Sequence, residues 1–525
     1  MATPRQAWRS RLGVVLAVAG SAIGLGNFLR FPVQCASNGG GAFLIPYFIA
    51  LIFLGLPLMW AEWAMGRYGG QFGHGTTPGI FQKLWNHPSA KYFGSLGIVI
   101  CSGLAIYYVY VESWTLAYAW FSLTGRYFGI TTQAEMKNFL SAFQGIGASH
   151  GFTGIGTAYT FFLITFAINI YIMFHGIRGG IEKICNIGLP ILFVFALILV
   201  VRVFTIGTPD PSHPENSVLN GLGFLWNPDF SQLTKAKVWL AAAGQIFFTL
   251  SVGFCTIPAY ASYLKRNQDV ALTGLSSVTA NEFAEVILGG SIAIPIAVAF
   301  FGLSATALIA QGGAFNLGFA AMPLIFQKIP LGQLFGGIWF LLLFLAGITS
   351  SVSLCQPVIT FLEDEFQWSR KKAVFWAGLV WFLSAHPVIY FLGNGYLDEM
   401  DFWVGTLGVV FFALIETILF IWVYGPEKAW QEINIGAEIR IPRFFLFSLK
   451  YITPLYLLFL LITWGKQDGI RILFMKGVPA ENIPYIIAAR LFMLALFLLI
   501  TLLVNLSFCR RPASSERRLQ TEGRR

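Results

Sequence analysis

Apolar runs long enough to cross a lipid bilayer recur along almost the whole of this chain. A helix needs about 20 apolar residues to span the hydrocarbon core. By that measure the sequence predicts about twelve membrane-spanning segments, over residues 11–37, 41–66, 92–124, 158–174, 182–204, 238–263, 271–301, 332–362, 372–391, 398–424, 445–464 and 484–508. Only 11% of the 525 residues are charged, whereas a soluble domain carries about 25%. The chain is therefore predicted to be an all-α integral membrane protein in contact with the lipid bilayer.

Basic residues concentrate in alternate loops. They precede segment 11–37, follow segments 41–66, 238–263 and 332–362, and recur in the tail 509–525. With an even number of spans all of these regions lie on one side, and the positive-inside rule places both termini in the cytoplasm. The expected location is the plasma (inner) membrane. The net charge of +10 does not indicate nucleic-acid binding, because the basic residues lie in loops and tails.

The first predicted span is interrupted at residues 20–27, which read GSAIGLGN. A glycine inside a helix costs about 1 kcal/mol relative to alanine, and Gly20, Gly24 and Gly26 occur here beside Asn27. A break at mid-membrane frees backbone groups that lipid cannot satisfy, so a neighbouring helix, water or a bound solute must do so. The alternative is an ordinary packing interface, since Gly20 and Gly24 have the small-xxx-small spacing of helix contacts.

A second interruption, FTLSVGF at residues 248–254, comes five spans after the first. Two broken helices in corresponding positions of two five-span halves predict inverted repeats with a binding site at mid-membrane. The expected division of the chain is a cytoplasmic N-terminus with inner-gate residues (1–10), a first repeat (11–204), an extracellular loop (205–237), a second repeat (238–424), two further helices with their connecting loop (425–508) and a basic cytoplasmic tail (509–525).

Oxygen-bearing residues occur at and near these interruptions, and hard oxygens are the ligands that a sodium ion prefers. The breaks supply carbonyls and Asn27, and segment 271–301 supplies Asn281 with Glu285 one turn further on. Ala346, Thr349 and Ser350 are adjacent on one face of segment 332–362. The alternative for the Thr349–Ser351 hydroxyls is hydrogen bonding to carbonyls of their own helix.

Ionisable residues within spans are candidates for function or for structural pairing; they are Glu62, Glu112, Glu285 and Glu416. Arg30 and Asp401 are both expected toward the outer side, and Arg5 and Asp364 toward the inner side. Opposed pairs on the two sides of a central site suit alternating access, although each could be a surface salt bridge of little energetic weight.

An apolar pocket with one phenol is predicted between the two breaks. Leu104 shares a helix face with Tyr108, and Ser350 shares one with Leu354, by i, i+4 spacing. Phe248 and Phe254 would complete this pocket, with plain core packing as the alternative. The sequence shows no nucleophile–base pair and no metal-ligand spacing, so an enzyme is not expected.

Six segments closely resemble the neurotransmitter:sodium symporter family, and most closely its bacterial leucine-transporter branch. They are GSAIGLGNFLRFP (20–32), NGGGAF (38–43), YYVYVESW (107–114), GQIFFTLSVG (244–253), NEFAE (281–285) and TSSVSLCQP (349–357). The resemblance covers nearly the whole chain. It implies a five-plus-five inverted repeat with helices 1 and 6 broken at mid-membrane, followed by two further helices.

The resemblance also implies roles for individual residues. The first sodium site would use Ala22, Asn27, Thr249 and Asn281, and the second Gly20, Ile23, Ala346, Thr349 and Ser350. The substrate would contact Ser21, Ala22, Gly24, Gly26, Leu104, Tyr108, Phe248, Thr249, Ser251, Phe254, Ser350 and Leu354. The outer gate would be Arg30 with Asp401, and the inner gate Arg5, Trp8, Tyr263 and Asp364.

Two positions indicate what is carried. Relatives that carry monoamines have an aspartate where this chain has Gly24, so the ligand should bring its own carboxylate. Chloride-dependent relatives have a neutral residue where this chain has Glu285, so no chloride requirement is expected. Leu104 replaces a valine of the leucine-transporter branch and Leu354 an isoleucine, while Ser21 replaces an asparagine beside the site; the longer Leu104 side chain favours a smaller substrate.

The expected function is sodium-coupled symport of small to medium neutral, mostly hydrophobic L-amino acids, with two sodium ions and no organic cofactor. A homodimer is a further expectation. Two alternatives stay open: a proton-coupled amino-acid transporter that uses Glu62 or Glu285, and a membrane sensor that binds its ligand without transporting it.

Overall fold

The computed structural model describes residues 8–147 and 151–510, and in that part of the chain every regular element is a helix. Ten helices are long and apolar enough to cross a membrane. They are α3–α4 (Gly41–Gly70), α6 (Ala90–Thr124), α8 (Gly156–Phe174), α9 with its preceding turn (Ile177–Phe204), α13–α14 (Ala271–Phe301), α18 (Gly332–Phe366), α19 (Arg370–Tyr390), α20–α21 with their π-helical turns (Tyr396–Val423), α23–α24 (Phe444–Gln467) and α26 (Ile483–Arg510).

Both interrupted spans are broken in the structure. The helix α1 (Arg11–Ala22) and the continuous stretch Gly26–Ser37, which ends in α2 (Phe31–Ser37), are bent by 47°. The second broken span consists of α11 (Ala236–Leu250) and α12 (Thr256–Ala261). With these two, the structure agrees with the predicted all-α architecture and its broken helices.

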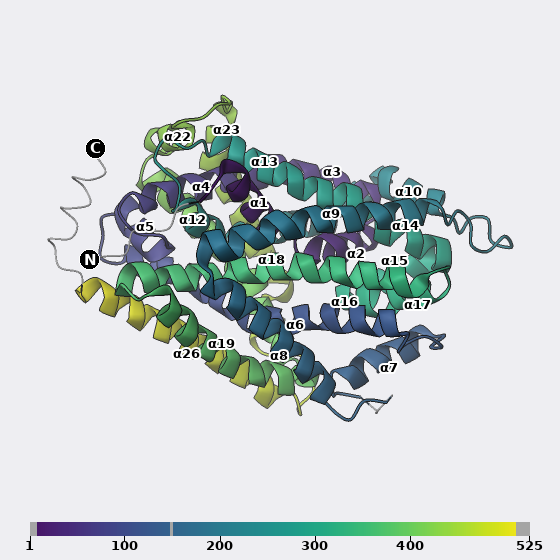
Figure 1. Ribbon diagram of the computed structural model, residues 1–525. Coiled ribbons are helices and arrows are strands. Elements are labelled where there is room, and N and C mark those ends of the chain that lie inside the picture. The colour runs from purple at the N-terminus through teal and green to yellow at the C-terminus, as the bar shows by residue number, and fades with distance from the viewer. Residues whose placement is uncertain (1–7, 148–150, 511–525) are drawn as a thin grey trace.

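Short helices cover the two ends of the long-helix bundle (Figure 1). The end that carries both chain termini in the view of Figure 1 holds α5 (Thr77–Leu84) and α22 (Pro426–Asn434). The opposite end holds α7 (Gln133–Phe143), α10 (Val218–Trp226), α15 (Leu303–Gln311) and the α16–α17 stretch (Ala314–Gln327). The apolar segment 302–331 therefore packs on the bundle as helices.

The long helices α6 and α18 lie side by side at the centre of the bundle. Gly347 permits their close approach, because a Cβ atom there would be 2.9 Å from Cγ of Glu112. The Glu112 carboxylate accepts a hydrogen bond from Nδ2 of Asn169 on α8, and Ser351 donates to Oδ1 of the same asparagine at 2.7 Å. Glu112 thus joins three helices, which is the structural role left open for it.

The helices α4 and α12 are in backbone contact. A Cβ atom at Gly66 would lie 2.4 Å from the carbonyl oxygen of Pro258, and one at Gly70 would lie 2.1 Å from that of Ser262. No side chain larger than hydrogen fits at such separations. These two glycines bind the end of the second span tightly to the second half of the broken span α11–α12.

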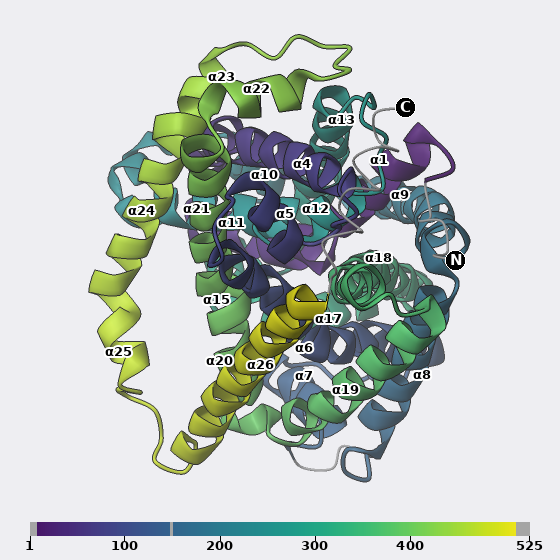
Figure 2. The ribbon, with the colours of Figure 1, turned by 90° about the vertical axis from the view of Figure 1, so that its left-hand side faces the viewer.

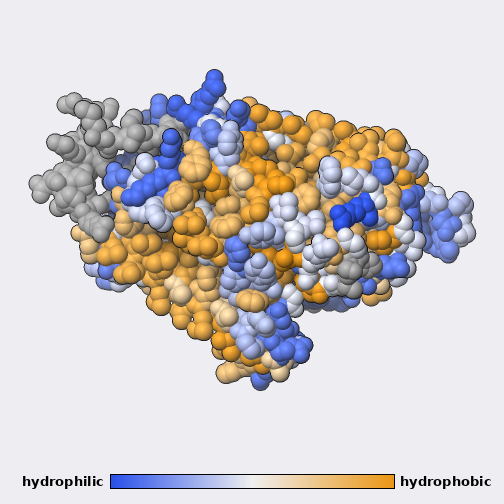
Figure 3. Space-filling view, turned by 60° about the horizontal axis from the view of Figure 1, so that its bottom comes forward, coloured by the Kyte–Doolittle hydropathy of each residue, from blue (hydrophilic) through white to orange (hydrophobic). Residues whose placement is uncertain are grey.

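Hydrophobic residues cover large continuous areas on the sides of the molecule, and hydrophilic residues gather toward its ends (Figure 3). The exposed leucines on the late helices include Leu455, Leu458, Leu491, Leu494, Leu498 and Leu502. Such patches on a water-soluble protein would promote aggregation. On this chain they form the surface expected to contact lipid tails.

Candidate functional site

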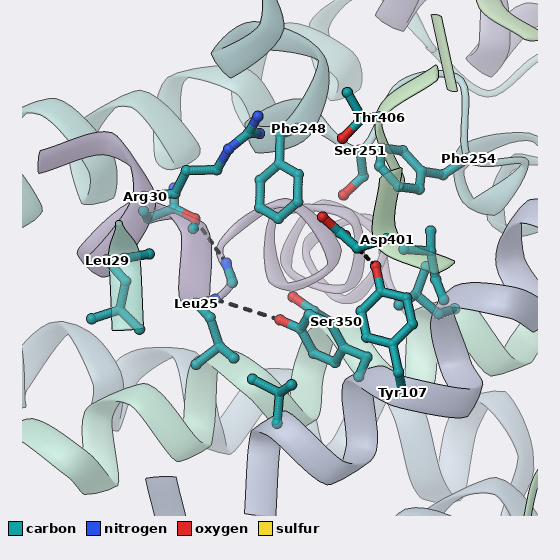
Figure 4. A pocket seen from close by; sticks show the side chains of 18 of the residues that line it. Leu25, Leu29, Arg30, Tyr107, Phe248, Ser251, Phe254, Ser350, Asp401 and Thr406 are labelled. Carbon is teal, nitrogen blue, oxygen red and sulfur yellow. Dashed lines mark hydrogen bonds between the residues drawn. The ribbon is translucent and has the colours of Figure 1, made fainter. Parts of the chain in front are cut away.

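A cavity of about 320 Å³ lies where the two broken spans meet α6 and α18 (Figure 4). Eleven of the twelve predicted substrate residues line it: Ser21, Ala22, Gly24, Gly26, Leu104, Tyr108, Phe248, Ser251, Phe254, Ser350 and Leu354. The twelfth, Thr249, lies behind the wall and is 1% exposed. A volume of this size is in the range of small-molecule sites.

The first break exposes backbone groups to this cavity. Ile23 ends α1 in an extended conformation, and the amide of Gly24 donates to Oδ1 of Asn27 at 2.8 Å. The amide of Leu25 points toward the hydroxyl of Tyr108 at 3.5 Å. Beyond the break, the helix restarts at Gly26, which lines the cavity, so the positive end of the helix dipole lies beside the cavity.

The second break is an unwound stretch with left-handed backbone at Ser251 (φ 54°), Gly253 (φ 78°) and Cys255 (φ 61°). The Ser251 hydroxyl donates to the carbonyl of Ser21 at 3.0 Å, which links the two breaks. The Gly253 amide donates to Oε1 of Glu62 on α4 at 2.6 Å. Glu62 therefore accepts the hydrogen bond of a backbone amide that would donate to a backbone carbonyl in a continuous helix.

Side-chain oxygens of three spans meet beside the cavity at Thr249. Its hydroxyl accepts from Nδ2 of Asn281 at 2.9 Å and from Nδ2 of Asn27 at 3.3 Å. Asn27 also donates to Oδ1 of Asn281 at 2.8 Å. All three side chains are almost completely buried. The structure thus brings together Asn27, Thr249 and Asn281, as predicted, in a dry cluster of uncharged oxygens that suits a hard monovalent cation.

Two carboxylates adjoin this cluster. Glu282 accepts hydrogen bonds from Nδ2 of Asn281 at 3.4 Å and from the hydroxyl of Tyr47 at 2.8 Å. Glu285 accepts hydrogen bonds from the hydroxyl of Tyr47 at 3.0 Å, from Nε2 of Gln245 at 2.9 Å, and from the hydroxyl of Thr249. Sequence reasoning found Glu285 but missed Tyr47 and Gln245. Tyr47 lies in an apolar span where nothing in the spacing marks it, whereas Gln245 lies in the second broken span, where a polar residue so close to the break was a usable signal.

Four residues of the predicted second set, Gly20, Ala346, Thr349 and Ser350, come together on α1 and α18. A Cβ atom at Gly20 would lie 3.3 Å from Cβ of Thr349, and Ser350 donates to the Ser21 carbonyl at 3.2 Å. The Thr349 hydroxyl donates to the carbonyls of Leu345 and Ala346, both at 3.1 Å. Hydrogen bonding within its own helix, the alternative for Thr349, is therefore what this structure contains. Ile23, also predicted here, is fully buried at the end of α1.

An aromatic ring closes the cavity near Gly26. A Cβ atom at Gly26 would lie 2.5 Å from Cε1 of Phe248, so the ring packs directly on the glycine backbone. The guanidinium of Arg30 lies 4.3 Å from the centre of the same ring, on the side shown in Figure 4. Phe248 is held between Gly26 and Arg30.

Arg30 and Asp401, the predicted outer pair, both line the cavity but have different partners. Arg30 stacks on Phe248, whereas Asp401 accepts a hydrogen bond from the hydroxyl of Tyr107 (Figure 4). The cavity continues past them to Asp398 and Phe315.

At the other side of the site, Trp8 is buried and donates from Nε1 to the carbonyl of Tyr260 at 3.1 Å. The hydroxyl of Tyr263 lies 3.0 Å from that of Thr360, one turn before Asp364 on α18. Trp8 is thus tied to α12, and Tyr263, which follows α12, is tied to α18. The fourth predicted gate residue, Arg5, lies outside the described residues.

Other lining residues were not predicted. Val111 lies three residues after Tyr108, so helical spacing could have identified it, whereas Thr406 has no such signal. Among the described residues, no group of three or more His, Cys, Asp or Glu side chains could hold a metal ion.

Comparison with known proteins agrees with these features. The model of the sodium:neurotransmitter symporter family matches residues 5–128 and 126–509. An uncharacterized sodium-dependent transporter of Methanocaldococcus jannaschii is 32% identical over 86% of this chain and 89% of its own. The sodium-dependent serotonin transporter of Drosophila melanogaster is 27% identical over 87% of this chain and 76% of its own.

Among solved structures, the crystal structure of MhsT in complex with L-phenylalanine superposes with a TM-score of 0.74. It is 27% identical and covers 87% of this chain and 99% of MhsT. The family match, the relatives and this fold together show that the chain is a multi-pass membrane protein belonging to the sodium:neurotransmitter symporter family.

Proposed function

We propose that this protein is a sodium-coupled symporter that imports small to medium neutral, mostly hydrophobic L-amino acids without a need for chloride. The observation that carries the proposal is the cavity between two broken spans, flanked by the cluster of Asn27, Thr249 and Asn281. The family supports sodium dependence, and the amino-acid complex of its relative MhsT supports the substrate class.

Sodium would bind at two places. The first is the cluster around Thr249, with the carbonyl of Ala22 and the carboxylate of the substrate completing the oxygen shell. The second would use carbonyls of Gly20, Ile23 and Ala346 with the hydroxyls of Thr349 and Ser350. For Thr349 this requires its hydroxyl to turn from its own helix carbonyls, a low-cost exchange because an ion–oxygen contact replaces a neutral hydrogen bond.

The ends of an amino acid match the two breaks. The carboxylate would meet the free amides near Gly26 and the hydroxyl of Tyr108, where the helix dipole favours negative charge. The ammonium group would meet carbonyls freed at Ala22 and at 248–251. At Gly24 a Cβ atom would lie only 2.7 Å from Oγ of Ser350. A larger side chain at Gly24 would have to displace the Ser350 hydroxyl, and glycine there leaves the carboxylate to be supplied by the substrate.

Transport would occur by alternating access, with both termini in the cytoplasm. The broken spans and their neighbours α3–α4 and α13–α14 would rock against the scaffold that contains α6, α8 and α18. Sodium and substrate share one carboxylate, so each would strengthen the binding of the other by the same factor. Phe248 with Arg30 would close the outer side, and Trp8 with Tyr263 the inner side.

Uptake by proteoliposomes tests this function. An inward sodium gradient at symmetric pH is expected to drive accumulation of a labelled neutral amino acid, and replacing sodium by potassium is expected to abolish it. A pH gradient without sodium should give no accumulation. Uptake under the pH gradient alone would show proton coupling instead, and sodium-dependent binding with no counterflow would show a sensor.

The side chain of Leu104 is expected to limit the size of the substrate. It is buried and lines the cavity, and Leu104→Val removes one methylene. Because one methylene in an apolar pocket discriminates by about 1–3 kcal/mol, the preference should move toward larger aliphatic amino acids by at least about tenfold. A competition scan against sodium-dependent binding measures this. Leu342→Val, buried on α18 away from the cavity, is the matched control, and equal scans for both variants would contradict the assignment.

A further inference from the structure

A second cavity, separate from the transport site, lies between α20, α26 and the loop that joins α24 to α26; it is lined by Glu399, whose neighbour Asp398 lines the central cavity. Its volume is about 280 Å³. Its walls are Glu399, Arg471, Ile472, Met475, Lys476, Gly477, Val478 and Arg490. Three of these residues are basic and only one is acidic, so the cavity suits an anion.

The charge of Arg490 is already balanced. Its Nε donates to Oε1 of Glu399 at 2.5 Å, and its two terminal nitrogens donate to the carbonyls of Leu473 and Ile472, both at 2.7 Å. Trp403 donates to the same Glu399 oxygen at 2.6 Å. Arg490 therefore fixes the loop to α20 and forms the floor of the cavity.

The charges of Arg471 and Lys476 are not balanced. Arg471 makes one long hydrogen bond, from Nε to the carbonyl of Lys476 at 3.4 Å. No ion pair of either side chain is found within the described residues, and both are exposed. Within the described residues, Arg471 and Lys476 have no acidic partner, whereas Arg490 is paired with Glu399. The cavity therefore has a positive electrostatic potential.

The position of this loop makes its charge unusual. In the proposed orientation residues 465–482 lie outside, where the positive-inside rule leaves few basic residues. Yet they contain Lys466, Arg471 and Lys476, together with Asp468 and Glu481. The longer outer loop 125–157 contains only Arg126 and Lys137. A departure from the usual charge bias favours a specific role for these cations.

Apolar side chains border the cavity and indicate that its occupant comes from the membrane. Ile470, Leu473 and Phe474 are 60%, 53% and 66% exposed, on and beside the short helix α25 (Ile470–Leu473). In Figure 2, α24 and α25 lie apart from α26, and the connecting loop leads from α25 to the start of α26. The exposed Leu491, one residue after Arg490, continues this apolar surface toward the lipid tails.

We propose that this cavity binds the phosphate headgroup of an anionic phospholipid of the outer leaflet. Arg471 and Lys476 pair with the phosphate, Arg490 and Glu399 form the rigid floor, and the acyl chains lie along the exposed faces of α24 and α26. Basic pockets next to apolar helix surfaces are a known form of anionic headgroup site. The proposal is independent of what the central cavity transports.

The test uses the full-length protein in nanodiscs or detergent, with phosphatidylglycerol against phosphatidylcholine, and native mass spectrometry to count retained lipids. The double variant Arg471→Gln/Lys476→Gln removes two cations. At about 1 kcal/mol per basic residue, its preference for phosphatidylglycerol should fall about 30-fold. Lys137→Gln/Lys328→Gln removes the same charge from other exposed positions at the same end and should leave the preference unchanged.

Three further results bear on the proposal. Raising the salt concentration should weaken the preference of the unaltered protein, because the contact is electrostatic. A preference that survives in the Arg471→Gln/Lys476→Gln variant overturns the site. Soluble glycerol phosphate or inorganic phosphate that displaces the lipid at millimolar concentration overturns the lipid as occupant, since the apolar surface would then contribute nothing. Sodium-dependent substrate binding checks that the variants are folded.

Discussion

Replacing Glu285 by serine is expected to abolish amino-acid uptake in chloride-free medium and to let chloride restore it. In the structure this carboxylate accepts hydrogen bonds from Tyr47, Gln245 and Thr249. Removing it leaves two buried donors, on Gln245 and Thr249, directed at the space it filled, because Tyr47 can still donate to Glu282 at 2.8 Å. Each unsatisfied buried donor costs about 1–3 kcal/mol. An anion of suitable size would satisfy both and would return the negative charge beside the proposed first sodium site. Uptake should fall at least about tenfold without chloride.

The control for this experiment is Glu285→Gln, which removes the charge but keeps the volume. Glutamine occupies the space that chloride would need, so this variant should stay inactive with or without chloride. Measurements in chloride and in gluconate separate the outcomes. If Glu285→Ser imports its substrate equally well in gluconate, the carboxylate has no charge role in coupling.

The second large effect is expected from Thr249→Val, which replaces a hydroxyl by a methyl group of almost the same size. The Thr249 hydroxyl is the one atom that contacts Asn27, Asn281 and Glu285 together. Hydrogen bonds that involve a charged group contribute about 1.5–3 kcal/mol, so the sodium concentration for half-maximal binding should rise about 13- to 160-fold. Substrate binding titrated with sodium gives this value directly.

Thr306→Val is the matched control. Thr306 is buried to the same degree, but its hydroxyl donates only to the carbonyl of Gly302, four residues earlier in its own segment. Its replacement should leave the sodium dependence unchanged. A Thr249→Val variant with the sodium affinity of the unaltered protein would exclude Thr249 from the first site, whatever its effect on the rate of uptake.

The architecture of this protein could be predicted from sequence because the bilayer imposes simple rules on it. Long apolar runs have to be helices, and the observed ends of α13–α14, Ala271 and Phe301, are those expected from composition alone. The two breaks were also visible, since glycine and polar residues are conspicuous in an apolar span. Composition could not show which side chains form hydrogen bonds with the backbone groups freed at the breaks. The bond between the Gly253 amide and the Glu62 carboxylate is an example.

The structure brings predicted site residues together where the residue type is rare in a membrane span, and it adds partners that were not predicted where the type is common. Asn27, Thr249 and Asn281 meet as expected, because few polar side chains exist at that depth. Tyr47 was missed because tyrosine is frequent in membrane spans. The expected partner of Arg30 was Asp401. In the structure the guanidinium stacks on the ring of Phe248, 4.3 Å from the ring centre. The sequence does not show which of these two partners lies nearer.

The close contact between α4 and α12 determines which parts of the molecule can move separately. Gly66 and Gly70 bring the two backbones together without intervening side chains, and the Glu62–Gly253 hydrogen bond ties α4 to the unwound stretch as well. A rotation of α12 therefore cannot occur by sliding over α4, because no layer of flexible side chains separates them. The two helices must therefore move together as one rigid unit. Any bending of the second broken span is confined to the few residues between Leu250 and Thr256.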